Sequence, residues 1–488
     1  MSRIDDITNQ RLEKLRKLRE DKQLDPYPQR YHRSHTTKEA ITLFEQGQEA
    51  EVSLAGRIIA VRSMGKATFM DIRDASGKIQ MYLGKGHLSE DKVELVKLFD
   101  IGDFIGVSGK VFKTRTGEIT LEVHDLTMLA KSLQPLPEKW HGLHDVEKRY
   151  RQRYLDLVSS EEVRNIFSVR SRVISSVRRF MEGRGFIEVE TPVLHSVPGG
   201  ARAHPFVTHH NALDEDLYLR IALELYLKRL IVGGFEKVYE IGRVFRNEGI
   251  STKHNPEFTM MESYEAYSDY NDVMRMLEEM VSAIANEVLG TMVVKFGEHT
   301  IDFKPPWKRM SLRDAVKDEC GIDFLDYDDS SKLREAMKNK GIATNETLSP
   351  AYLIDKLVST YVEPKLIQPT FLYDYPAETS PLAKCKEGDN RLVERFEAFV
   401  SGIEIANAFT ELNDPQEQAA RFNLQEEWRV KFGDQEAERY QEDFIVAMEH
   451  GMPPTGGLGV GIDRLVMLLT GQQSIREVIL FPQLKSKQ

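Results

Sequence analysis

Residues 50 to 130 contain about five short segments of alternating apolar and polar residues, and this pattern most narrows the folds open to the chain. Glycine-containing turns such as Asp74-Ala75-Ser76-Gly77 and Thr116-Gly117 separate the segments. Alternation with a period of two predicts strands, and about five strands in so short a stretch predict a small closed barrel. The oligonucleotide-binding barrel, or OB-fold, is one such barrel, and the pattern alone leaves other small barrels open. The predicted strands begin near Val52, Thr68, Lys78, Ile105 and Ile119.

Helices and strands are both predicted outside this region. Residues 1–24 carry apolar side chains at partly helical spacing, and Pro135 and Pro137 mark a linker after the barrel. Beyond residue 160, apolar patterns predict helices at 167–181 and 463–470 and strands at 237–241 and 403–409. The length of 488 residues and this mixture predict two or three domains of the α+β class.

The composition narrows the cellular compartments and the binding partners that the protein can have. A formal net charge of −11 argues against a protein that coats nucleic acid indiscriminately, although a local basic face would suffice for phosphate contacts. The two cysteines, Cys320 and Cys385, have no metal-binding spacing and fit a reducing compartment. The N-terminus is too polar for a signal peptide and no long apolar run occurs, so we expect a cytoplasmic protein without a membrane span.

Four glycines, at positions 456, 457, 459 and 461, precede the apolar run 465–469. Their spacing differs from the Gly-x-Gly-x-x-Gly of dinucleotide-binding folds, and too few residues follow for a complete βαβ unit. We therefore expect these glycines to let the backbone pass close to a ligand or a neighbouring strand.

Arg246 and Glu248 lie two residues apart, which on a strand places both side chains on one face. A guanidinium can hold a phosphate through two parallel charge-assisted hydrogen bonds, and Phe258 could stack on a base. A surface ion pair is the ordinary interpretation of an isolated Arg-x-Glu. No zinc site is expected from His204, His209 and His210, because neither cysteines nor a His-Glu-x-x-His spacing accompany them.

Five glutamates are candidates for binding cations. Glu397 and Glu404 would suit magnesium beside a triphosphate, although the residues alone favour two surface glutamates. Glu224, Glu262 and Glu411 stand among apolar residues, where a buried carboxylate needs a partner. Carboxylates that converge on one pocket favour a cationic ligand, and three separate salt bridges are the alternative.

Segments 185–192, 245–259 and 456–464 together resemble motifs 1, 2 and 3 of the class II aminoacyl-tRNA synthetases. Segments 198–206, 208–211, 224–230 and 405–413 resemble the bacterial lysyl-tRNA synthetases, and the similarity covers nearly the whole chain. This resemblance implies an N-terminal OB-fold β-barrel and a catalytic domain on an antiparallel β-sheet flanked by helices. The implied parts are an N-terminal helical segment at 1–45, an anticodon-binding OB-fold at 46–131, a linker at 132–160 and the catalytic domain at 161–488.

The resemblance also implies the reaction. ATP would activate L-lysine to lysyl-adenylate, and the lysyl group would pass to the 3′ end of tRNA(Lys). Arg246 and Arg464 would be the catalytic residues, with Arg246 on the α-phosphate and the substrate carboxylate. Adenine would lie between Phe258 and Arg464. The implied ATP-binding residues are Arg246, Glu248, His254, Phe258 and Arg464.

Further roles follow from the same resemblance. Glu397 and Glu404 would hold Mg2+, and Phe69 would stack on the anticodon. Pro192 and its motif would belong to a homodimer interface. The implied anticodon-binding residues are Arg57, Phe69, Gln80 and Glu118. The implied lysine-binding residues are Gly200, Glu224, Arg246, Glu262, Tyr264, Asn407, Phe409 and Glu411.

Three positions depart from the family pattern. Leu223 stands where relatives usually have proline, Ile403 replaces a usually polar residue, and Lys253 stands where many bacterial relatives have arginine. Leu223 in place of proline affects the local backbone conformation. Lys253 in place of arginine could weaken a bidentate phosphate contact. None of the three removes a residue on which the implied chemistry depends.

Four other functions are weighed against the lysylation of tRNA that the resemblance implies. An aspartyl- or asparaginyl-tRNA synthetase would share the architecture but would need cationic residues where this chain has Glu262 and Glu411. A synthetase-like enzyme that lysylates a protein acceptor would resemble the catalytic half but would lack the barrel. A non-catalytic RNA-binding paralogue would have no reason to keep the phosphate-binding and carboxylate residues together. Secondary synthesis of diadenosine polyphosphates is compatible with the sequence.

Overall fold

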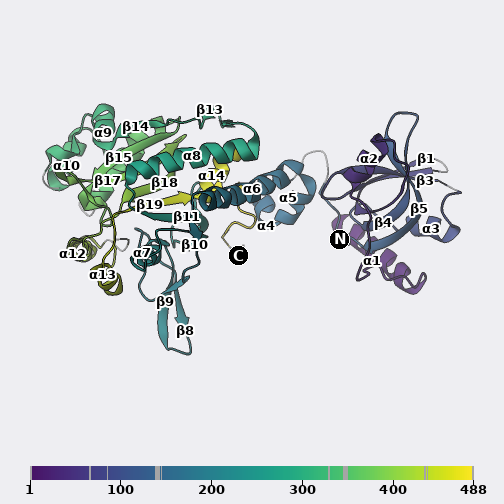
Figure 1. The fold of residues 1–488 in the computed structure, drawn as a ribbon. Coiled ribbons are helices and arrows are strands. Elements are labelled where there is room, and N and C mark those ends of the chain that lie inside the picture. The colour runs from purple at the N-terminus through teal and green to yellow at the C-terminus, as the bar shows by residue number, and fades with distance from the viewer. Residues whose placement is uncertain are drawn as a thin grey trace. The chain divides into compact units, whose positions relative to one another are not determined.

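The computed structural model describes residues 3–485 except 65–66, 85, 138–142, 144, 328–329, 345–349, 434–435 and 437. Its contacts divide the chain into two compact units, Met1–His144 and Asp145–Gln488 (Figure 1). The first unit contains a closed five-stranded barrel, and the second is built on a large, mostly antiparallel sheet with helices packed on it. The predicted α+β class and the order of its two parts are confirmed. Within the described residues, none of the helices is long and apolar enough to cross a membrane.

The barrel closes in the strand order β1-β2-β3-β5-β4. Alternate residues of β3, such as Ile79 and Met81, are buried in its interior, as the period-two pattern requires. The first strand, predicted at residues 52–54, runs from Glu51 to Met64. Gly56 lets it pass close to Arg73, whose carbonyl oxygen would lie 2.9 Å from a Cβ at this position. The elements of this unit are α1 (Arg3–Glu20), α2 (Thr37–Glu45), β1 (Glu51–Met64), β2 (Ala67–Arg73), β3 (Lys78–Gly84), α3 (Glu90–Val96), β4 (Phe104–Lys113) and β5 (Ile119–Ala130).

The large sheet of the second unit has the strand order β14-β15-β17-β18-β19-β11-β10-β6, with β16 paired to β17. Among the described strands of this sheet, only β6 with β10 and β14 with β15 pair in parallel. The strands of the unit are β6 (Ile187–Glu188), β7 (Leu194–His195), β8 (Val207–His210), β9 (Glu215–Leu219), β10 (Lys237–Phe245), β11 (Glu257–Ala266), β12 (Val293–Phe296), β13 (His299–Asp302), β14 (Lys308–Ser311), β15 (Thr370–Pro376), β16 (Cys385–Lys386), β17 (Asp389–Val400), β18 (Ile403–Thr410) and β19 (Thr455–Gly461).

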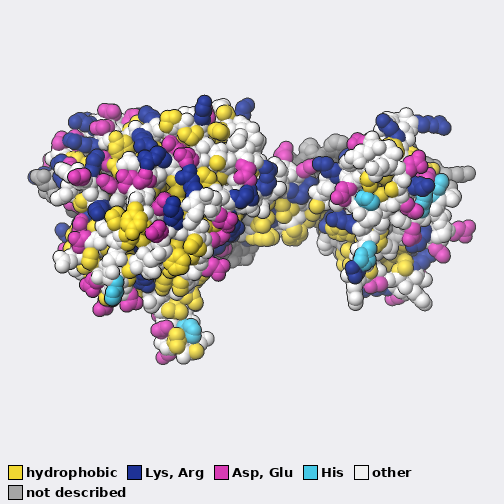
Figure 2. Space-filling view, viewed as in Figure 1, with side chains coloured by type: hydrophobic (Ala, Val, Ile, Leu, Met, Phe, Trp, Pro, Cys, Tyr) yellow, Lys and Arg dark blue, Asp and Glu magenta, His cyan; other side chains and the backbone are white. Residues whose placement is uncertain are grey.

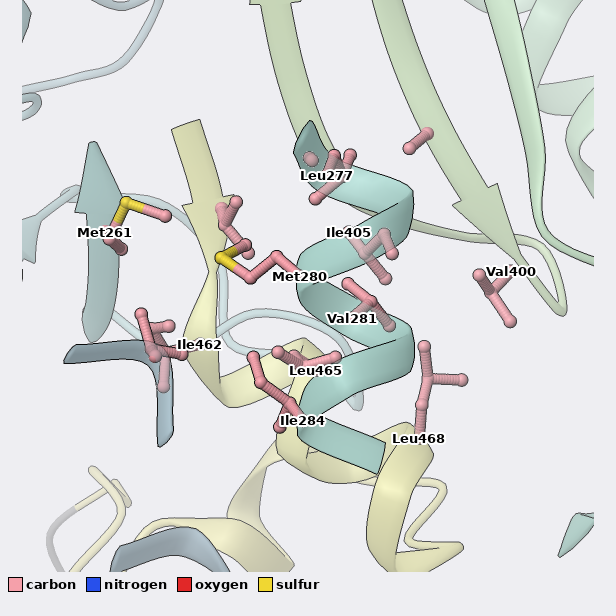
Figure 3. Close-up of a cluster of buried hydrophobic side chains, with 14 of the residues drawn as sticks. Met261, Leu277, Met280, Val281, Ile284, Val400, Ile405, Ile462, Leu465 and Leu468 are labelled. Atoms are coloured by element: carbon pink, nitrogen blue, oxygen red, sulfur yellow. The ribbon is translucent and has the colours of Figure 1, made fainter. Parts of the chain in front are cut away.

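Helix α8 packs against one face of this sheet, and helix α14 follows the last strand (Figure 3). The N-terminus of α8 is capped by Asp269, whose side chain accepts hydrogen bonds from two backbone amides, and Gly290 ends the helix at a φ of 74°. The α-helices of the unit are α4 (Val146–Arg151), α5 (Arg153–Ser159), α6 (Glu161–Gly183), α7 (Glu224–Val232), α8 (Tyr270–Leu289), α9 (Leu312–Cys320), α10 (Ser330–Asn339), α11 (Pro350–Leu357), α12 (Pro415–Phe432), α13 (Glu442–Glu449), α14 (Ile462–Thr470) and α15 (Ile475–Val478).

Candidate active site

A cavity of about 740 Å³ lies over strands β11, β17, β18 and β19 of the large sheet. All fourteen residues that the resemblance implies for the catalytic domain line this cavity. The structure therefore brings together side chains that are up to 264 positions apart, from Gly200 to Arg464. Their individual roles remain predictions, for which the following contacts supply the geometry.

Sheet register explains why distant residues meet in this cavity. Glu397 on β17 pairs with Asn407 on β18, Asn407 pairs with Gly459 on β19, and Gly459 pairs with Glu262 on β11. Side chains that lie directly opposite on neighbouring strands project from the same face of a sheet. One row across four strands therefore delivers two carboxylates and an amide to the cavity.

A second row lies two residues along from the first and faces the same way. It runs from Arg395 through Phe409 and Gly457 to Tyr264. In both rows the β19 position is a glycine. A Cβ at Gly457 would lie 1.8 Å from Oε1 of Glu411 and 2.7 Å from the Tyr264 ring. The expected close approach to a neighbouring strand is seen at Gly457 for Tyr264 of β11, whereas Glu411 follows the end of β18.

Carboxyl groups gather at one end of the cavity around the chain's own Lys228. The Nζ of Lys228 donates to Oε1 of Glu224 at 2.6 Å and also contacts Glu411. Oε1 of Glu411 is buried and has no hydrogen-bond partner among the described residues. Glu262 accepts hydrogen bonds from the Leu223 amide at 3.0 Å and the Tyr264 hydroxyl at 3.2 Å. This end of the cavity therefore offers an unsatisfied acceptor for a cationic group.

Burial sets the protonation of these carboxyl groups. Desolvation, with the nearby charge of Glu224, raises the pKa of Glu262 to about 7. The same causes, in the same order, raise the pKa of Glu438 to about 8, and burial holds the pKa of Glu411 well above its ordinary value. Because every added negative charge is costly here, a cation that enters is stabilised by the carboxylates that it allows to ionise.

Aromatic and cationic groups also line the cavity. The guanidinium of Arg246 lies over the Phe258 ring, 5.2 Å from its centroid, and its Nε donates to the carbonyl oxygen of Ile221. Arg464 donates to both the carbonyl and the carboxylate of Glu404, at 2.8 and 3.1 Å. Its other terminal nitrogen lies 3.4 Å from Nε2 of His254. Phe258 and Arg464 both line the cavity, as an adenine site between them would require.

Asp463 fixes the position of Arg464 relative to strand β11. Its Oδ2 accepts a hydrogen bond of 2.6 Å from the Thr259 amide, and Arg170 donates to its other oxygen. Asp463 is fully buried, and its contact with the Thr259 amide is made away from water. The residue after Phe258 and the residue before Arg464 are thereby joined, which fixes the two predicted stacking partners relative to each other.

Glu397 and Glu404 have the chemistry that a magnesium ion requires. Oε2 of Glu397 accepts from the Tyr375 hydroxyl at 2.9 Å, and Oε1 accepts from Arg395 at 2.6 Å. Burial raises the pKa of Glu397 to about 7, and the neighbouring charge of Glu404 contributes. Each carboxylate oxygen can accept a second contact, and two hard oxygen donors suit Mg2+. The residues therefore fit the ion, which would relieve the repulsion between the two carboxylates.

The residues that the sequence analysis did not assign to the site include Arg395 and Glu438, which line the cavity, and Lys228, which contacts two of its carboxylates. Lys228 lies one helical turn after Glu224, and this i,i+4 spacing in the sequence could have predicted their ion pair. Glu438 accepts a hydrogen bond of 3.2 Å from the amide of Gly200, which ties it to an implied lysine-binding residue. It comes from a polar segment that resembles a solvated surface in the sequence, so no local pattern would have identified it.

The barrel holds the four implied anticodon-binding residues on its outer side. Phe69 on β2 and Gln80 on β3 belong to adjacent strands and share an outward face, because the intervening residues are buried. The hydroxyl oxygen of Thr120 lies 3.1 Å from the side-chain oxygen of Gln80 and 3.3 Å from the carbonyl oxygen of Glu118, either of which can accept its proton. Arg57 lies on β1, with its guanidinium 4.2 Å from the centre of the Phe104 ring.

An unpredicted aromatic residue extends this outer face. The ring of Tyr82, on β3 opposite Phe69, lies 5.3 Å from the Phe69 ring. Two neighbouring aromatic rings on a barrel face provide a surface on which unpaired bases can stack.

The structure shows what surrounds the three residues that depart from the family pattern. The amide of Leu223 donates to Glu262, and proline at this position would have no N–H to offer. Ile403 is buried in the core that also contains helix α8. Lys253 donates to the carbonyl of Gly402 at 2.7 Å and lines the cavity. Leu223 therefore adds a hydrogen bond to a predicted substrate-binding carboxylate.

Both units match known protein families. Residues 145–485 match the family model described as tRNA synthetases class II (D, K and N), and residues 52–129 match the OB-fold nucleic acid binding domain. The chain belongs to the class II tRNA synthetases of the D, K and N group.

Its relatives within this group agree in name. The chain is 56% identical to the lysine–tRNA ligase of Dehalococcoides mccartyi (strain ATCC BAA-2266 / KCTC 15142 / 195), over 99% of this chain and 98% of the relative. It is 53% identical to the lysine–tRNA ligase of Pelotomaculum thermopropionicum, over 99% and 96%, and 51% identical to that of Bacillus cytotoxicus, over 98% and 97%. The resemblance to lysyl-tRNA synthetases is confirmed.

Proposed function

We propose that the protein acts as a lysine–tRNA ligase, which activates L-lysine with ATP and transfers the lysyl group to tRNA(Lys). The observation that carries the assignment of the amino acid is the buried carboxyl cluster, in which Glu411 retains an unsatisfied oxygen. Free lysine carries two ammonium groups at neutral pH. An uncharged amino-acid side chain would leave the buried Oε1 of Glu411 without a partner, and this cost supports selection for lysine.

The bound lysine would span the cavity. Its ε-ammonium would meet Glu262, Glu411 and Tyr264, with Asn407 and Phe409 beside it. Its α-ammonium would meet Glu224 and the backbone of Gly200, and its carboxylate would lie toward Arg246. Because the carboxyl cluster and Arg246 line the same cavity, both ends of one lysine molecule have complementary partners.

The first step is a displacement at the α-phosphorus of ATP. The lysine carboxylate attacks, the bond to the departing pyrophosphate breaks, and lysyl-adenylate forms. Arg246 would neutralise charge on the α-phosphate, Phe258 and Arg464 would hold the adenine, and Glu248 and His254 would complete the ATP site. Catalysis would depend on alignment and charge stabilisation, without a dedicated general base. Mg2+ held by Glu397 and Glu404 would supply charge neutralisation at the phosphates.

In the second step, the 3′-hydroxyl of the terminal adenosine of the tRNA attacks the activated carbonyl and releases AMP. Arg57, Phe69, Gln80 and Glu118 on the barrel would contact the anticodon, with Phe69 stacking on a base. The free thiols of Cys320 and Cys385 fit the predicted cytoplasmic location.

A homodimer is proposed as the assembly. Around the motif of Pro192, the apolar side chains of Ile187, Val193, Leu194 and Val197 are between 40% and 51% exposed. A group of exposed apolar residues in one segment is typical of an interface.

The decisive experiment is ATP–pyrophosphate exchange with each of the twenty amino acids, followed by charging of tRNA(Lys). Exchange that depends on lysine alone would support the proposal. Exchange with aspartate or asparagine would overturn the assignment of the carboxyl cluster. Exchange with lysine but no transfer to tRNA would favour a protein acceptor, and no exchange at all would favour an RNA-binding paralogue.

Lysine affinity is expected to increase as the pH rises from about 6 to about 8. An ammonium binds the ionised form of Glu262, whose pKa of about 7 leaves it largely protonated at the lower pH. Binding therefore releases a proton, and affinity should increase by up to about tenfold per pH unit below the pKa and then level off. Calorimetric titration with lysine would measure this, with Glu262→Gln as a control that should lose the part of the slope due to this group. An affinity that decreases over the same range would contradict the prediction.

Leu223→Pro is expected to move this pH dependence to higher pH. The substitution removes the amide that donates to Glu262, so the carboxylate form loses one stabilising hydrogen bond. A hydrogen bond to a charged group contributes about 1.5–3 kcal/mol, which predicts roughly tenfold or more weaker lysine binding near neutral pH. Leu223→Ala keeps the amide and serves as the matched control for lost packing. Identical pH profiles for the two variants would exclude a role for the amide.

A further inference from the structure

Two histidines and a glutamate form a compact cluster on the outer side of the barrel. His87 lies in the turn after β3, and Glu122 and His124 lie two residues apart on β5. Nε2 of His87 is 3.6 Å from Oε1 of Glu122, and Nε2 of His124 is 3.6 Å from Oε2 of the same carboxylate. One ligand atom from each residue lies within 4.8 Å of the other two. Histidine side chains reach the surface of this unit (Figure 2).

We propose that His87, Glu122 and His124 form a binding site for a divalent transition-metal ion, with Zn2+ as the principal candidate. Zinc binds histidine nitrogen at about 2.0–2.1 Å and carboxylate oxygen at about 2.0–2.2 Å in a tetrahedral arrangement, which sets neighbouring ligand atoms roughly 3.3–3.5 Å apart. The two separations of 3.6 Å, each from one imidazole to a different oxygen of Glu122, are close to this spacing. They also exceed a normal hydrogen bond, so the three groups are gathered without being bonded to one another.

A second carboxylate, that of Glu51, contacts His124. Nδ1 of His124 is 3.4 Å from Oε1 of Glu51, at the start of β1. Histidines that bind metals usually donate their other ring N–H to a carboxylate, which fixes the tautomer and directs the remaining nitrogen to the ion. Glu51 would hold the proton of His124 on Nδ1 and leave Nε2 free to coordinate.

Neighbouring rings restrict the orientation of the site. The rings of His87 and His124 are nearly parallel, at 15°, with centroids 6.3 Å apart. Tyr82 packs edge-on against His87 at 6.3 Å. The set of two imidazoles and one carboxylate matches the ligands of zinc with an open fourth position, and it favours Zn2+, Co2+ or Ni2+ over Mg2+, which prefers oxygen. A bound ion would join the turn after β3 to strand β5.

Calorimetric titration of the full-length protein with ZnCl2 tests the proposal, with Mg2+ present in excess to occupy the carboxylates of the catalytic cavity. We expect one equivalent of zinc to bind tightly, and His87→Ala and His124→Ala to weaken its binding by at least about tenfold. His32→Ala is the matched control, because His32 is an exposed histidine of the same unit. Equal zinc binding by all four proteins, or no stoichiometric binding by the wild type, would overturn the site.

Two further readouts distinguish coordination from a general effect on folding. Co2+ should give the visible absorption of an ion bound by protein ligands in the wild type and not in His124→Ala. Zinc should raise the unfolding temperature of the wild type and the His32 variant but not of the two cluster variants, since a ligand that binds only the folded state stabilises it. Lysine-dependent ATP–pyrophosphate exchange should stay unchanged in the cluster variants, because these residues have no part in the proposed reaction. An equal rise in all variants would contradict the proposed ligands.

Discussion

Replacing Arg246 with alanine is expected to lower the rate of lysine-dependent ATP–pyrophosphate exchange by about 10²–10³-fold. The loss corresponds to about 3–4 kcal/mol, which is typical of removing one preorganised group that stabilises charge in a transition state. The guanidinium lies over Phe258 and lines the cavity, where it would contact both the α-phosphate and the lysine carboxylate. Arg246→Lys should recover little of the activity, because an ammonium cannot reproduce the planar fork.

Arg243→Ala provides the matched control for this prediction. Arg243 lies on strand β10, which ends at Phe245, one residue before Arg246. Arg243 is exposed, lies 3.8 Å from Glu257, and is outside the residues that line the cavity. Its loss should change the exchange rate by less than about twofold, since exposed ion pairs contribute little. If both arginine variants lost activity equally, a general effect on strand β10 would explain the result better than a role in catalysis.

Gly457→Ala is expected to raise the KM for lysine by about two orders of magnitude. The added Cβ would lie 1.8 Å from Oε1 of Glu411 and 2.7 Å from the Tyr264 ring, so the carboxylate must leave its place. Glu411 and Lys228 are both fully buried, and disrupting a buried ion pair typically costs about 3–5 kcal/mol. Part of this cost should also appear as a lower unfolding temperature.

Gly459→Ala, two residues along the same strand, is the control. Its Cβ would lie 3.1 Å from the terminal methyl group of Met260, which can move, and 3.7 Å from Glu262. We expect a several-fold effect on the KM for lysine, because a flexible side chain can adjust where a buried carboxylate cannot. Steady-state exchange kinetics over a range of lysine concentrations would compare the two variants. A larger effect at Gly459 than at Gly457 would show that Glu411 is not the sensitive group.

Much of the fold followed from periodicity. The barrel strands, helix α6 and helix α14 were predicted because their apolar residues repeat at the spacing of each element. Strand β1 was underestimated, since residues 55–64 do not alternate cleanly and a register shift between Ile58 and Ala60 interrupts its pairing with β2. The order of strands in the large sheet was not predictable, because pairing depends on contacts between segments distant in the sequence.

The candidate site depended on the resemblance more than on local patterns. Glu397, Asn407, Gly459 and Glu262 share one row of the sheet, and no spacing in the sequence indicates that β17, β18, β19 and β11 are neighbours. By contrast, Glu224 and Lys228 stand at helical i,i+4 spacing and could have been paired from the sequence. The placement of Arg246 over Phe258 was unexpected, because only Arg464 had been assigned to the predicted ring stack.

Lys228 has a consequence for how substrate preference could change. Its ammonium already neutralises part of the negative charge of the carboxyl cluster. A ligand therefore has to supply only the positive charge that the glutamates still lack. A protein with the same glutamates and a neutral residue at position 228 would demand a more highly charged ligand. Acceptance of an uncharged amino acid would instead require the removal of glutamates while Lys228 remained. Lys228 therefore contributes, together with the glutamates, to the selection of the amino acid that binds.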